Sequence, residues 1–211
     1  MDNINYILFI CVVVPLILML FILDKKSRIT VGYMIVGTFM CLFISEVNGL
    51  LLNYFHNDMY YVTTTITPIT EELIKALPIL YFAVLFSDKR ETLISISIAT
   101  GIGFAVLENL VILVGNVENV SLFWALVRGF SSALMHGVCT AAVGMGISFV
   151  HKKKKMFYTG TFALLAAAII YHATFNCLVQ SPYKYAGFLL PLVTYTPILI
   201  VIARRKKAYE A

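Results

Sequence analysis

Residues 67–86 read TPITEELIKALPILYFAVLF, a stretch long and apolar enough to cross a membrane. Glu71, Glu72 and Lys75 nevertheless lie near its N-terminal end. A charged side chain at the centre of a bilayer costs at least ~2.5–3.5 kcal/mol, so such residues are seldom present without a function. We therefore expect the rest of the chain to bring other polar side chains to these two glutamates.

The composition of the chain indicates an integral membrane protein. Of its 211 residues, 60% are hydrophobic and 13% are charged, whereas soluble domains average about 25% charged residues. Apolar runs recur along the whole chain, and the connections between them are too short to fold independently. We therefore expect residues 1–211 to form one membrane-embedded domain. The net charge of +5 does not indicate a nucleic-acid partner, because the basic residues cluster between the apolar runs.

The hydropathy pattern predicts an all-α bundle of about seven transmembrane helices. They span residues 4–23, 30–53, 67–87, 92–115, 122–150, 156–178 and 186–203. Lysine and arginine cluster in alternate connections, namely DKKSR (24–28), SDKRE (87–91), HKKKK (151–155) and ARRKK (203–207). Cytoplasmic loops carry the excess of these residues. The pattern therefore predicts a multi-pass protein of the cell membrane with its N-terminus outside and its C-terminus in the cytoplasm.

Ionisable residues inside the predicted spans lie at a similar depth. At 1.5 Å per residue, Glu71 and Glu72 lie about 6–8 Å below the outer end of their helix. Glu108 lies about 10 Å and His172 about 9 Å below the outer ends of theirs. His136, in an overlong span, lies roughly 14–20 Å down. Four helices thus bring carboxylates and imidazoles together in the outer half of the bilayer, where the lipid bilayer surrounds the site.

Structural ion pairing is the alternative explanation for some of these charges. It suits Glu46, Lys75 and Arg128, which can balance charge by pairing and need no chemical role. We expect Glu46 to pair with Arg128 or with Lys75. Lys75 also lies one turn from Glu71 and Glu72 and can hold them in place.

Each candidate functional residue has a neighbour four positions away, on the same face of its helix. These pairs are Glu71 with Lys75, Phe104 with Glu108, His136 with Thr140, and His172 with Asn176. A neighbour of this kind can orient a ligand or a catalytic base. The spacing therefore predicts that the residues four positions away orient the functional groups.

Two imidazoles and a carboxylate suit a catalytic metal ion with one position open to water. A further carboxylate can then take a proton from that water. The chain has no HExxH sequence, so the site is not of the zincin type. No serine has a histidine at an obvious spacing, which leaves a serine nucleophile as a weaker alternative.

Non-enzymatic functions also use intramembrane glutamates and histidines. A proton or ion pathway is one such function, and a binding scaffold is another. Transporters often show internal repeats with matching broken helices, and the chain shows neither pattern. A relay should also place polar groups across both leaflets, whereas the predicted cytoplasmic half is apolar away from the helix ends.

Four short motifs in this chain resemble those of the PrsW family of intramembrane proteases. EELIK (71–75) resembles its EExxK motif, and FAVLEN (104–109) resembles its FxxxEN motif. HGVCT (136–140) resembles its histidine motif, and HATFN (172–176) resembles its HxxxN motif. Each motif alone is weak, but four in order on successive spans are specific. The resemblance covers a core of about residues 67–178.

The resemblance implies a site and a reaction. One of Glu71 and Glu72 would activate water, with Lys75 beside them. Glu108, His136 and His172 would bind a divalent metal such as zinc or, without a metal, the water and the oxyanion. Asn109 and Asn176 would orient these groups or stabilise the oxyanion.

PrsW-like enzymes make the first, extracytoplasmic cut in a single-span anti-sigma factor, which starts release of its sigma factor. The implied function is thus an intramembrane endopeptidase with such a partner. The family is grouped with the CAAX prenyl proteases and the Abi proteins, so a protease of that type with another substrate is an alternative. The prenyl proteases have a histidine at the position of Glu108, which disfavours that alternative. The superfamily also resembles the non-catalytic scaffold subunit of γ-secretase, so the fold alone does not imply activity.

Overall fold

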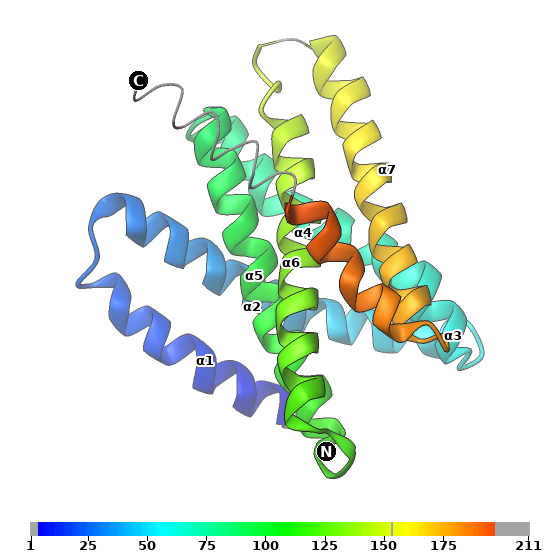
Figure 1. Cartoon of the computed structure of the whole chain (residues 1–211). Coiled ribbons are helices and arrows are strands. Elements are labelled where there is room, and N and C mark those ends of the chain that lie inside the picture. The colour runs from blue at the N-terminus through cyan, green and yellow to red at the C-terminus, as the bar shows by residue number, and fades with distance from the viewer. Residues whose placement is uncertain (1–3, 153, 197–211) are drawn as a thin grey trace.

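The computed structural model describes residues 4–152 and 154–196 as a bundle of helices (Figure 1). Their order is α1 (Ile4–Leu20), α2 (Lys25–Tyr54), α3 (Met59–Tyr61), the π-helix η1 (Val62–Ile66), α4 (Thr67–Leu85), α5 (Arg90–Gly115), the 3₁₀ turn η2 (Val117–Asn119), α6 (Leu122–Ile147) and α7 (Lys154–Val179). Residues 184–196 are also helical, and the rest of the predicted last span lies outside the described residues. The described part of the chain contains no strand, which confirms the all-α prediction.

The helix α5 lies at the centre of the bundle. It packs against α2 and α6, and α6 packs in turn against α7. Figure 1 shows α5 and α6 side by side, with the α1–α2 hairpin in blue on one side and α7 in yellow on the other. The helix α4 contacts α2, α5, α6 and α7. Its charged residues can therefore meet side chains from several helices inside the bundle.

Four of the described helices, α2, α5, α6 and α7, are long and apolar enough to cross a membrane by length and composition. The helix α1 is apolar but has 17 residues. Large apolar side chains cover the outside of the bundle, including Phe21 (80% exposed), Leu122 (89%) and Phe162 (73%). Lipid tails are the natural surroundings of such a surface. The described residues are thus those of an all-helical, multi-pass membrane protein, while the seven spans and their orientation stay predictions.

The sequence did not predict two helical regions correctly. Residues 59–66, expected in an outer connection, are helical and run through α3 and η1 directly into α4. Three consecutive threonines there disfavour a helix by intrinsic propensity, so contacts with other helices must stabilise it. The helix α2 begins at Lys25 instead of residue 30, because the Asp24 carboxylate caps it. That carboxylate accepts hydrogen bonds from the backbone N–H groups of Lys26 (2.9 Å) and Ser27 (3.2 Å).

Glycines allow α5 to approach both of its neighbours closely. A Cβ atom on Gly103 would overlap the carbonyl oxygen of Met34 on α2, and one on Gly101 would overlap that of His136 on α6. Small residues at helix interfaces are how helices come into close contact in lipid. Gly101 thus fixes the distance between α5 and the segment that carries His136.

We expect the substitution Gly103→Ala to destabilise the protein, because the added methyl group forces α2 and α5 apart. Overpacking of this kind costs about 1–3 kcal/mol. Gly32→Ala on α2 is the matched control, since no atom lies within 4 Å of the position that its methyl carbon would occupy. The check is the midpoint of thermal unfolding in detergent. Equal midpoints for both variants would contradict the close contact of α2 and α5.

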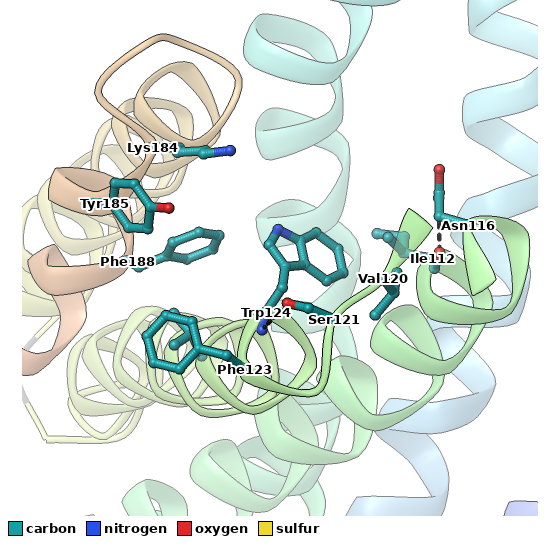
Figure 2. A pocket seen from close by; sticks show the side chains of 10 residues that line it. Ile112, Asn116, Val120, Ser121, Phe123, Trp124, Lys184, Tyr185 and Phe188 are labelled. Atoms are coloured by element: carbon teal, nitrogen blue, oxygen red, sulfur yellow. Dashed lines mark hydrogen bonds between the residues drawn. The ribbon is translucent and has the colours of Figure 1, made fainter. Parts of the chain in front are cut away.

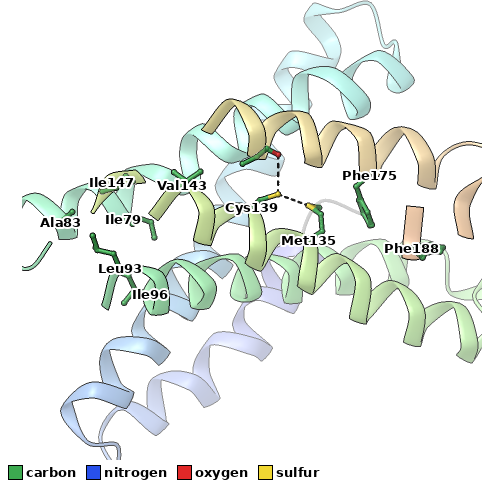
Figure 3. Close-up of a cluster of buried hydrophobic side chains, with 11 residues drawn as sticks. Ile79, Ala83, Leu93, Ile96, Met135, Cys139, Val143, Ile147, Phe175 and Phe188 are labelled. Atoms are coloured by element: carbon green, nitrogen blue, oxygen red, sulfur yellow. Dashed lines mark hydrogen bonds between the residues drawn. The ribbon is translucent and has the colours of Figure 1, made fainter. Parts of the chain in front are cut away.

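An apolar core runs along α4, α5, α6 and α7 and extends to the helix of residues 184–196 (Figure 3). Its buried members are Ile79, Ala83, Leu93, Ile96, Met135, Cys139, Val143, Ile147, Ala168, Phe175 and Phe188. These side chains are all apolar apart from the weakly polar thiol of Cys139, which donates to the Ala168 carbonyl oxygen (3.6 Å). The core holds together the three helices that carry Glu72, His136 and His172.

Candidate active site

Lys75 lies at the centre of a buried polar cluster. Its Nζ atom lies 2.6 Å from Glu72 Oε1 and 3.7 Å from Glu71 Oε2, both on the preceding turn of α4. The same Nζ lies 2.9 Å from Nδ1 of His136 on α6. The Lys75 side chain is fully buried, with 0% exposure. An ammonium group without water is tolerated only when paired, and here two carboxylates surround it.

The two histidines approach the glutamates from α6 and α7. His172 Nδ1 lies 3.0 Å from Glu72 Oε1, and His172 Nε2 lies 3.8 Å from Glu71 Oε2. The rings of His136 and His172 have their centroids 4.9 Å apart and are nearly perpendicular. Both residues are fully buried. Residues 100 positions apart in sequence, Glu72 and His172, are thus in direct contact.

Glu108 approaches the other side of His136. Its Oε2 atom lies 3.4 Å from His136 Nε2 and accepts hydrogen bonds from Ser132 Oγ (3.1 Å) and Arg128 Nη2 (3.3 Å). Its side chain is 24% exposed. Phe104, one turn earlier on α5, packs its ring against His136 with the centroids 4.9 Å apart. Residues 104–109 of α5 therefore contact His136 twice, through the ring of Phe104 and the carboxylate of Glu108.

We predicted that Thr140 orients the ring of His136 and that Asn176 orients the ring of His172, and both predictions are wrong. The Thr140 hydroxyl donates to the backbone carbonyl of His136 (2.8 Å), not to its ring. The Asn176 side chain donates to the carbonyl oxygen of Thr63 (2.9 Å), not to His172. Lys75 and Glu108 hold the two ring nitrogens of His136, and Glu72 holds Nδ1 of His172.

Asn176 instead ties α7 to the π-helix η1. Thr63 receives the Asn176 hydrogen bond at its carbonyl and donates its own hydroxyl to Gln180 Oε1 (3.1 Å). These contacts explain how a threonine-rich segment stays helical. π-Helical turns are frequent at functional sites, and this one leads directly into the helix that carries the glutamates. Asn109 is buried beside Glu108, and its Oδ1 atom has no hydrogen-bond partner in the described structure.

The prediction that Glu46 pairs with Arg128 or with Lys75 is wrong. Glu46 accepts a hydrogen bond from the Tyr6 hydroxyl (3.1 Å). Within the described residues, the ion-pair partners of Lys75 are Glu71 and Glu72, and that of Arg128 is Glu108. Glu46 lies on the face of α2 that contacts α1, and therefore pairs with neither Lys75 nor Arg128.

Arg128 and Ser132 are site residues that the sequence did not identify as such. They lie one turn apart on α6, and both donate to Glu108 Oε2. The guanidinium of Arg128 also lies 5.8 Å from the centre of the Trp124 ring. The spacing of Arg128, Ser132 and His136 at four-residue intervals is a signal that places all three on one helical face.

The polar cluster fits a divalent metal ion. Glu71 Oε2, Glu72 Oε2 and His172 Nε2 are buried and have no hydrogen-bond partner in the described structure. Ligand atoms of Glu71, Glu72, His136 and His172 all lie within 4.8 Å of one another. Two imidazoles with carboxylates are a usual ligand set for zinc and similar ions. Glu108 lies outside this group of four and contacts it through His136.

Two cavities of similar size lie near these residues. One, of about 460 Å³, is lined by Glu71 and Glu108 together with apolar side chains of α2 and α5. The other, also about 460 Å³, lies between the start of α6 and residues 184–188, and Figure 2 shows Trp124, Tyr185, Phe188 and Lys184 around it. No residue of the Glu–His cluster lines this second cavity. Of these two cavities, the first is thus the one that reaches the cluster, at Glu71.

Comparison with known proteins agrees with this geometry. Residues 27–202 match the family described as PrsW family intramembrane metalloprotease. The chain belongs to the PrsW family. It is 26% identical over 210 residues to Protease PrsW of Clostridioides difficile (strain 630), an alignment that covers 91% of this chain and 86% of that protein. No solved structure matches the chain.

Membership of the PrsW family identifies the chain as an intramembrane protease. The resemblance found in the four sequence motifs is thereby confirmed. The matched region contains all of α4, α5, α6 and α7, the helices that supply the buried glutamates and histidines. The described helices thus provide what an intramembrane protease requires, namely polar groups gathered inside a bundle with an apolar exterior.

Proposed function

We propose that the chain is a glutamate- and metal-dependent endopeptidase that makes the first, extracytoplasmic-side cut in a single-span anti-sigma factor of the cell membrane. The observation that carries the proposal is the convergence of two glutamates and two histidines in a buried group whose ligand atoms lie within 4.8 Å. PrsW family membership supports the proteolytic reaction. The whole chain, residues 1–211, acts as one domain, with its chemistry in the core of residues 67–178.

The contacts support a division of roles among the site residues. His136 and His172, with Glu71 or Glu72, would hold the metal ion. A divalent ion bound there supplies Lewis-acid polarisation of the scissile carbonyl and activation of water. The other glutamate of the pair takes the proton from the attacking water and delivers it to the leaving amine.

The remaining site residues position this group. Glu108 orients His136, and Arg128 and Ser132 orient Glu108 through hydrogen bonds of 3.3 and 3.1 Å. Lys75 balances the carboxylates of α4. Asn109, whose buried Oδ1 atom is unpartnered in the described structure, and Asn176 are proposed to stabilise or orient the site, Asn176 through η1.

The proposed orientation places the site in the outer half of the bilayer. Seven spans with the N-terminus outside put the start of α4, and with it Glu71 and Glu72, near the outer surface. The positively charged connections between the helices support this orientation. A cut at this depth releases the extracytoplasmic part of the substrate first.

Co-expression with a single-span anti-sigma factor tests the proposed function. The substrate carries a different epitope at each end, and cells without the protease serve as the comparison. We expect a shortened, membrane-bound fragment only when the protease is present. Mass spectrometry of that fragment should place the new terminus on the outer side of the substrate's span. A cut within the cytoplasmic half, or the same fragment without the protease, would refute the proposal.

A further inference from the structure

The cavity beside the catalytic cluster has the composition of a peptide-binding site. Its wall is formed mainly by α2, η1, α4 and α5, with one residue each from α1 and α3, and Glu71 and Glu108 are the charged residues among the described residues that line it. Most of the other lining side chains are apolar, including Leu52 and Leu107. A volume of about 460 Å³ lies within the range of about 300–1,000 Å³ that is usual for ligand sites. The cavity is therefore large enough for several side chains at once.

Polar side chains are interspersed along this apolar wall. Ser45 and Asn48 of α2 and Thr63 of η1 all line the cavity. A peptide bond can be hydrolysed only where the substrate helix has unwound, and unwound backbone has unpaired N–H and C=O groups that are costly in lipid. Hydroxyl and amide groups beside the cluster can pair with that backbone. An apolar wall with uncharged polar groups therefore suits an extended apolar peptide.

We propose that this cavity binds an extended, apolar stretch of the substrate's membrane-spanning segment, next to the bond that is cut. The inference rests on the proposed function, because it names the substrate chemistry of the same site. Continuity with the cluster favours a peptide as the occupant, since Glu71 belongs to both and Glu108, also in the lining, contacts His136 of the cluster. Lysine and arginine are missing from the described lining, so the cavity does not suit an anionic lipid headgroup.

Gly49 sets how large the bound side chains can be. It lines the cavity on α2, and no atom lies within 4 Å of the position that its Cβ would occupy. Ser45 and Leu52 lie on the same face of α2, four positions before and three after. A larger side chain at Gly49 thus fills cavity space without displacing the backbone.

The test is the substrate preference of Gly49→Leu. Two versions of one cleaved single-span substrate are compared, with either leucines or alanines in the positions flanking the mapped cut. We expect Gly49→Leu to lower kcat/KM for the leucine substrate at least about tenfold relative to the alanine substrate, as removal of pocket space does. Gly32→Leu is the matched control. It lies on the same helix with equally open surroundings but outside the cavity, and its preference should equal that of the unaltered protein.

A preference unchanged by Gly49→Leu overturns the inference while leaving the proposed function intact, because the protein still cuts its substrate. Gly49→Ala, a smaller change, should shift the preference in the same direction by a smaller factor, and it covers the case in which Gly49→Leu does not fold. If the unaltered protein cleaves neither substrate, the proposed function itself is refuted.

Photo-crosslinking gives a second, independent readout. A photoreactive benzoylphenylalanine replaces Leu52 in the cavity wall, in a chain inactivated by His172→Ala. We expect a crosslink to the membrane-spanning segment of the co-expressed substrate, and none when the same group replaces residue Phe162 on the lipid-facing surface. A crosslink to lipid alone from position 52 overturns the inference.

Discussion

Cleavage should fall at least ~10²-fold when His172 is replaced by alanine, because the change displaces Glu72, and a positioned acid–base group contributes ~10²–10⁴-fold. The Nδ1 atom of His172 contacts Glu72 Oε1 at 3.0 Å, and its Nε2 atom lies 3.8 Å from Glu71 Oε2. Removing the ring thus removes one of the four residues that could hold a metal ion. It also removes the side chain that holds Glu72 in place. Both consequences affect the reacting groups directly.

Glu72→Gln should produce a loss of similar size for a different reason. The amide keeps the shape of the side chain but can neither take a proton from water nor bind a cation well. The measurement for both variants is the initial rate of fragment formation from the single-span substrate, at matched protein levels. His151→Ala and Glu91→Gln are the controls, because both residues are exposed, His151 in the turn after α6 and Glu91 in the first turn of α5. Undiminished cleavage by His172→Ala or Glu72→Gln would show that the cluster is not the catalytic centre.

These residues could be predicted from the sequence because charges in an apolar span are unusual. Glu71, Glu72 and Lys75 lie within five residues of one another, so any helix places them together. His136 and His172 could be grouped with them by their depth in the predicted spans, and the structure brings both into contact with α4. The helical fold followed in the same way from the lengths of the apolar runs.

The partner of each side chain could not be predicted, because it depends on how the helices rotate about their axes. Glu46 and Glu108 both lie within predicted spans, yet Glu108 pairs with Arg128 whereas Glu46 bonds Tyr6. The helical state of residues 59–66 was missed for a related reason. Local propensity disfavours a helix there, and the hydrogen bond from Asn176 that supports it comes from 113 positions further along the chain. Contacts at that separation leave no periodic signal in the sequence.

Replacing Lys75 by methionine should strongly destabilise the fold. The fully buried ammonium of Lys75 lies between Glu71 and Glu72 and contacts Nδ1 of His136. Removing one partner from a buried ion pair leaves an uncompensated charge and costs about 3–5 kcal/mol. The measurement is the thermal unfolding midpoint of the metal-free protein in detergent. Lys152→Met is the control, because the ion pair of Lys152 with Asp88 is 47% exposed on the lysine side, and exposed pairs contribute only ~0–1 kcal/mol.

A second substitution separates lost charge balance from lost packing. If uncompensated charge is the cause, Lys75→Met combined with Glu72→Gln should be more stable than Lys75→Met alone, since it removes one of the carboxylates left unpaired. Methionine and lysine have similar lengths, so a packing defect would persist in the double variant. Added zinc should also raise the unfolding midpoint of Lys75→Met more than that of the unaltered protein, because a metal ion held by the cluster would take Glu72 and His136, which are the partners of Lys75. An equal response to zinc would mean that the ammonium and the metal ion do not share these ligands.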